Sequence, residues 1–121
     1  MNKKDIKIRN GCCVRIDDTD FGIVSKVDSS NDYIWVQWFK KGKVTKEKEA
    51  TLNCGFQIGM EVQDIPLSRT RKTLGEGIVI ECRKIGNREQ VLVDFLESGE
   101  KHWLPFQNLK LIEGIKQRFI L

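Results

Sequence analysis

The stretch Tyr33-Ile34-Trp35-Val36-Gln37-Trp38 decides the fold, because its side chains alternate between two different faces. A period of two predicts a β-strand whose buried side carries Ile34, Val36 and Trp38. The stretch Gln90-Val91-Leu92-Val93-Asp94-Phe95 repeats the pattern further along the chain. Clusters of Gly, Asn, Asp and Ser flank both stretches, so we expect short strands joined by tight turns.

The chain contains two copies of one longer pattern. The number of residues that separates matching positions of the two copies increases only in the expected loops, where insertions cost little stability. Each copy opens with Gly-x-x-Val, continues with Gly-Ile-Val, and then reaches the alternating strand and a Gly turn. The matching residues of the two copies are Gly11 and Gly59, Val14 and Val62, Gly22 and Gly77, Val36 and Val93, Trp38 and Phe95, Gly42 and Gly99, and Leu52 and Leu109.

Each copy accommodates five strands, and so small a sheet buries its apolar side best by curling into a barrel. The sequence therefore predicts an all-β protein with two tandem five-stranded barrels, over residues 1–55 and 56–113. Residues 114–121 then start a linker or helix of a longer chain, or form the packed tail of a complete small protein. The positions expected to face inward are Val14, Ile16, Ile23, Ile34, Val36 and Trp38 in the first copy and Val62, Ile78, Ile80, Val91, Val93 and Phe95 in the second.

Composition excludes several classes of function. With 121 residues, 40% of them hydrophobic, the chain holds one compact domain or two very small ones and no large enzyme. No apolar run is long enough to cross a bilayer and no signal core follows Met1, so we expect a soluble, cytoplasmic protein that contacts no membrane. The net charge of +4 is far below that of a dedicated nucleic-acid arm.

The sequence contains no recognisable catalytic, cofactor-binding or metal-binding motif. The four cysteines, Cys12, Cys13, Cys54 and Cys82, have no zinc-ligand spacing, and we interpret them as buried or half-buried thiols in a reducing compartment. The single histidine, His102, is expected on the outward side of a strand with no nucleophile beside it. The Gly75–Gly77 turn lacks the Lys of a phosphate-binding loop. We therefore expect no cofactor, no metal and no small-molecule substrate.

The second copy resembles a known family. Gly59-x-x-Val62, Leu74-Gly75-Glu76-Gly77-Ile78-Val79, Val91–Phe95, Gly99-Glu100-Lys101 and Asn108-Leu109 look like the SH3-like Tudor/KOW barrels attached to bacterial helicases and transcription factors. Single barrels of this kind end UvrD/PcrA-type helicases, and tandem ones resemble the N-terminal region of RapA/HepA-type ATPases of the SWI/SNF class. The resemblance implies a non-catalytic interaction module whose partner is RNA polymerase or the protein's own ATPase motor.

Two basic loops are candidate contacts. Arg69, Arg71 and Lys72 lie in the loop that the second copy has gained between its first two strands. They suit nucleic-acid phosphates or an acidic protein surface, and a solvated loop explains them equally well. Lys40, Lys41 and Lys43 occupy a hairpin tip, for which a solvated turn is the simpler explanation. If these loops do bind DNA or RNA directly, the chain is a KOW-like nucleic-acid module instead.

Aromatic residues form the third candidate. Tyr33, Trp35 and Phe39 are expected on one face of a single strand, where they cannot converge into a cage for methylated lysine. We expect this face, with Leu92 and Leu96 in the second copy, to pack barrel against barrel or barrel against motor. If it is exposed instead, its rings can stack nucleic-acid bases, which makes Trp35 a nucleic-acid contact.

Overall fold

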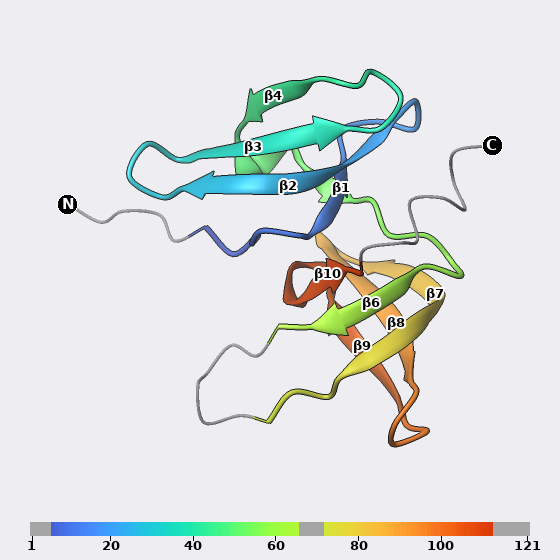
Figure 1. The fold of residues 1–121 in the computed structure, drawn as a ribbon. Coiled ribbons are helices and arrows are strands. Elements are labelled where there is room, and N and C mark those ends of the chain that lie inside the picture. The colour runs from blue at the N-terminus through green and yellow to red at the C-terminus, as the bar shows by residue number, and fades with distance from the viewer. Residues whose placement is uncertain (1–5, 66–71, 113–121) are drawn as a thin grey trace.

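The computed structural model describes residues 6–65 and 72–112 (Figure 1), and within these ranges the protein is all-β. The predicted linker at residues 114–121 lies outside them. The described residues contain no helix with the length and apolarity needed to cross a membrane.

The first half contains strands β1 (Cys13–Arg15), β2 (Phe21–Asp28), β3 (Tyr33–Trp38), β4 (Val44–Glu47) and β5 (Asn53–Cys54), with a 3-10 turn, η1 (Glu49–Thr51), before β5. The second contains β6 (Glu61–Asp64), β7 (Glu76–Ile85), β8 (Arg88–Phe95), β9 (Lys101–Pro105) and β10 (Leu109–Leu111), with η2 (Phe106–Asn108) before β10.

The strands form two antiparallel sheets with the same connectivity (Figure 1). The first has the order β4-β3-β2-β1-β5 and the second β9-β8-β7-β6-β10, so the fifth strand of each pairs with the first. The prediction of two five-stranded units is thus confirmed at the level of sheets. In the described residues the end strands of a sheet do not pair with one another, so each sheet remains open.

The backbone repeats at matching positions. The Gly11 amide donates to the Val24 carbonyl at 2.8 Å, and the Gly59 amide donates to the Val79 carbonyl at the same distance. A β-bulge follows Val24 in β2, and another follows Val79 in β7. Because a bulge advances one strand by a residue, it changes which side chains of β2 and β7 face outward beyond it.

The inward positions of β2 and β7 differ from the prediction by one residue. Val24 and Val79 are fully buried, whereas Ile23, Ile78 and Ile80 are only half-buried. The inward position before each valine is taken by a glycine. A Cβ on Gly22 would lie 2.6 Å from the Gln37 carbonyl oxygen, and one on Gly77 would lie 2.4 Å from Val93 Cγ1, so no side chain fits there.

The remaining inward positions mostly follow the prediction. Ile16 is the exception: β1 ends at Arg15, and Ile16 lies 42% exposed in the turn that follows. The other predicted positions are buried: Val14, Ile34, Val36, Trp38, Val62, Val91, Val93 and Phe95.

The two sheets share one core, and polar contacts tie them together. The Leu111 amide of β10 donates to the Gly11 carbonyl at 2.8 Å. Glu89 of β8 accepts from the Cys54 amide at 3.2 Å, and its other oxygen lies 3.9 Å from Arg15. Cys12 and Cys13, adjacent in sequence, are both fully buried, and the Cys12 thiol lies 3.5 Å from the Phe106 carbonyl oxygen of the second half.

Candidate recognition surfaces

The outward side of the first sheet carries an aromatic–lysine face, which we define as Lys26, Tyr33, Trp35 and Lys46. Trp35 of β3 is the direct cross-strand neighbour of Lys26 in β2 and of Lys46 in β4. The bulge after Val24 creates this alignment, because it shifts the pairing so that Lys26 lies opposite Trp35. Both lysines are exposed, and both aromatic side chains are half-buried.

The rings of this face present their π surfaces rather than their edges to the Lys46 cation. Lys46 Nζ lies 4.5 Å from the centre of the Tyr33 ring and 5.6 Å from that of Trp35. A cation is attracted to the negative face of an aromatic ring. The π surfaces of both rings are therefore turned toward a solvent-exposed ammonium group, which another planar or charged ligand can displace.

In the second sheet, the row of outward side chains that runs across neighbouring strands at the matching position consists of different residue types. Leu92 of β8 lies between Glu81 of β7 and Trp103 of β9. The Arg83 guanidinium lies 3.8 Å from the centre of the Trp103 ring. We call Arg83, Leu92 and Trp103 the Trp103 edge, because β9 is an end strand of its sheet.

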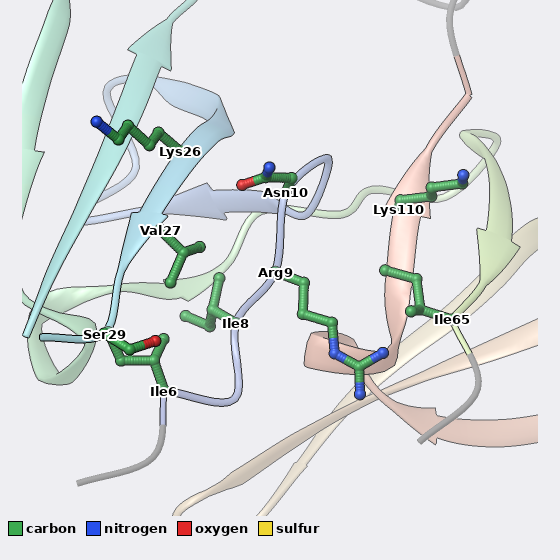
Figure 2. Close-up of a pocket in the computed structure, with 9 residues that line it drawn as sticks. All are labelled: Ile6, Ile8, Arg9, Asn10, Lys26, Val27, Ser29, Ile65 and Lys110. Carbon is green, nitrogen blue, oxygen red and sulfur yellow. The ribbon is translucent and has the colours of Figure 1, made fainter. Parts of the chain in front are cut away.

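A cleft of about 550 Å³ lies beside the N-terminal segment (Figure 2). None of the residues that line it is acidic. Figure 2 shows the Arg9 side chain extending toward the side of Ile65, with the ammonium groups of Lys26 and Lys110 pointing away from one another. The lining residues are Ile6, Ile8, Arg9, Asn10, Lys26, Val27, Ser29, Ile65 and Lys110.

The predicted basic hairpin tip is present, and a buried carboxylate shapes it. Asp20 is 6% exposed and accepts from the backbone amides of Lys40 at 3.0 Å and Lys41 at 3.2 Å. The side chains of Lys40, Lys41 and Lys43 are exposed. Lys41 Nζ lies 5.6 Å from the centre of the Trp38 ring. This tip lies beyond the Trp38 end of β3 and is separate from the aromatic–lysine face.

The loop of Arg69 and Arg71 lies outside the described residues, and Lys72, just after it, is exposed. Phe39 follows the end of β3 at Trp38, and its ring packs on that of Phe21, with 4.8 Å between the ring centres.

The two leucines that were expected to pack, Leu92 and Leu96, differ in their exposure. Leu96 is 61% exposed, because β8 ends at Phe95 and Leu96 begins the following turn. Leu92 is half-buried on β8, in the row that also holds Trp103.

Sequence reasoning named Trp35 but missed both lysines that flank it. Lys26 and Lys46 lie far apart in sequence and become neighbours only through strand register. An exposed Lys on each side of an aromatic strand is a weak signal by itself. The position of the bulge, which fixes the pairing, has no clear sequence signature.

The side chain of the single histidine lies on a different side of its sheet from the one predicted. His102 faces the same side of its sheet as Val93, its cross-strand neighbour, rather than outward as predicted, and its ring lies 5.8 Å from that of Phe95. No group of three or more potential metal ligands occurs among the described residues.

The thiols are poor nucleophiles. Cys12, Cys13 and Cys54 are buried as predicted, whereas Cys82 is exposed. Burial raises the pKa of Cys54 to about 12 and also raises the pKa values of Cys12 and Cys13. Partial burial raises the pKa of Cys82 as well. The reactive thiolate form is therefore scarce at neutral pH.

Comparison with known proteins adds no family. The chain matches no protein-family model and no curated protein.

Proposed function

We propose that this protein is a non-catalytic tandem recognition module that binds another protein through the Trp103 edge. In this proposal each sheet curls as an SH3-like, Tudor/KOW-like barrel, and the module anchors or regulates a helicase-like ATPase. Its partner is RNA polymerase or the ATPase motor of the same protein. The assignment of these partners rests on the resemblance of the sequence to RapA/HepA-type proteins.

The open end strand β9 is the observation that carries the proposal. No described strand pairs with its outer side, so its backbone amide and carbonyl groups are available to a strand of a partner. Side chains beside an added strand provide specificity. The Trp103 edge supplies Trp and Arg, two residue types that dominate the binding energy of protein interfaces.

The charge around the Trp103 edge also suits a protein better than a nucleic acid. On the outward rows of the second sheet, Glu81 and Asp94 balance Arg83 and Lys101. A balanced surface gives no net attraction for a phosphate backbone, whereas an apolar centre with a mixed polar rim is typical of protein interfaces.

The test is binding of the purified full chain to RNA polymerase and, separately, to the helicase-like motor, by calorimetry in low and high salt. We expect one of the two to bind with an affinity that changes little with salt. Trp103→Ala should weaken that binding by about thirtyfold or more, because it removes the central anchor.

Trp35→Ala is the matched control, because it removes an outward tryptophan from the other sheet and should leave the affinity for the protein partner unchanged. Binding to neither protein would overturn the proposal. Equal losses for Trp103→Ala and Trp35→Ala would also overturn it, because the Trp103 edge would then have no special role.

A further inference from the structure

We infer that the aromatic–lysine face is a binding site for single-stranded nucleic acid, with Tyr33 and Trp35 stacking unpaired bases and Lys26 and Lys46 contacting phosphates. This function goes beyond the proposed protein recognition and uses a different sheet. It also differs from binding through the basic loops, because none of these four residues belongs to the loops at Lys40–Lys43 or at residues 66–71.

The spacing of the two rings fits consecutive bases. Tyr33 and Trp35 are two residues apart on β3, so they lie on the same side of the sheet, about 7 Å apart along the strand. Successive bases of a single strand stack on aromatic platforms of this kind. A base pair inside a duplex has no free face, so the geometry excludes duplex nucleic acid from the same contacts.

The lysines place positive charge on both sides of the platform. Lys26 and Lys46 flank Trp35 from the neighbouring strands, each about 4.8 Å away in the direction across the sheet. The nearest acidic side chain in the pairing is Asp28, opposite Tyr33, and its carboxylate accepts from Ser30 and Asn31 in its own turn. Two lysines outnumber this one carboxylate, so the net charge of the face complements a phosphate backbone.

The resident cation does not block the site. Lys46 is exposed, and a cation–π contact at an exposed position strengthens an interaction by only about two- to fivefold. Stacking of one base on an aromatic ring contributes about five- to a hundredfold. A base therefore displaces the Lys46 ammonium from the ring, and the freed ammonium can pair with a phosphate.

The cleft beside the N-terminal segment adjoins the aromatic–lysine face at Lys26. Lys26 belongs both to the aromatic–lysine face and to the cleft lining, where Lys110 supplies a further cation. A strand that runs from Trp35 toward β2 thus continues over a region whose lining contains no acid.

The experiment measures binding of fluorescein-labelled (dT)15, (rU)15 and a 15-base-pair duplex to the full chain by fluorescence anisotropy at several salt concentrations. We expect both single strands to bind within about threefold of each other, since the contacts involve bases and phosphates and not the ribose hydroxyl. We expect the duplex to bind at least about tenfold more weakly.

Four variants and one control locate the site. Trp35→Ala should weaken binding of (dT)15 by about tenfold or more, and Trp35→Phe should restore most of it, because a smaller ring still stacks. Lys26→Gln and Lys46→Gln should each reduce the slope of log affinity against log salt by about 0.7. Trp103→Ala, the matched control on the second sheet, should leave (dT)15 binding unchanged.

Several outcomes would overturn the inference: equal affinity for the duplex, unchanged affinity in Trp35→Ala, or an equal loss in Trp103→Ala. Tighter binding of a polyglutamate peptide than of (dT)15 to the same face would assign it to an acidic protein segment instead. Circular dichroism of each variant verifies the fold. A negative result with nucleic acid does not affect the proposed protein interface, because the calorimetric test of that interface depends on Trp103.

Discussion

The two sheets share their strand order, their bulge and their buried glycine, yet their outward rows differ completely. The first sheet has Lys26–Trp35–Lys46 where the second has Glu81–Leu92–Trp103. The shared features concern backbone pairing and inward side chains, where a change disrupts the fold. Outward positions tolerate exchange, so two copies of one framework can present a cationic and a neutral surface.

The largest expected effect tests the shared framework. Gly77→Ala and Gly22→Ala should each destabilise the protein by about 3 kcal/mol, because the added methyl group overlaps a neighbouring side chain and a backbone carbonyl. Chemical denaturation followed by tryptophan fluorescence measures both losses. If the two sheets share one framework, the losses agree within about 1 kcal/mol.

Gly42→Ala is the control, since nothing lies within 4 Å of its added Cβ. Gly42 has a φ of +64°, a left-handed conformation that costs an alanine about 1 kcal/mol, and we expect no further loss of stability. A large loss of stability for Gly77→Ala with a negligible one for Gly22→Ala would mean that the two matching glycines do not contribute equally to the stability of their sheets.

The next effect tests the difference between the outward rows. The triple variant Lys26→Glu, Trp35→Leu and Lys46→Trp gives the first sheet the row of the second. We expect it to fold, because these positions are exposed or half-buried, and to lose binding of (dT)15 by about a hundredfold. Anisotropy measures the loss, and retained affinity would show that the row does not determine binding.

The sequence predicted much of the framework and little of the site. The alternating strands around Tyr33–Trp38 and Gln90–Phe95 were identified correctly, because side-chain period reports directly on a half-buried strand. The prediction was one residue wrong at Gly22 and Gly77, since a glycine facing inward leaves no apolar signal at its position. The pairing of Lys26 with Trp35 depends on a bulge, which local residue patterns do not specify.

The smallest expected effect comes from thiols, which also distinguish the two halves. Cys13 and Cys54 lie buried on β1 and β5, which pair at one end of the first sheet, while Cys82 is exposed on β7 of the second. Burial raises the pKa of Cys54 from its usual 9.0 to about 12. Above pH 9 the unfolded chain therefore loses this proton while the folded chain keeps it, and stability falls as the pH rises toward 12.

Urea denaturation at pH 8 and pH 10 measures this loss, which should be about 1 kcal/mol for each buried thiol. Cys54→Ala should reduce the difference between the two pH values by about that amount, because one titrating group is gone. Cys82→Ala should reduce it less, since its pKa rises less in a site that water still reaches. Equal reductions in the two variants would contradict the difference in burial between Cys54 and Cys82. The comparison also removes the background titration of lysine and tyrosine, because both variants retain every such residue.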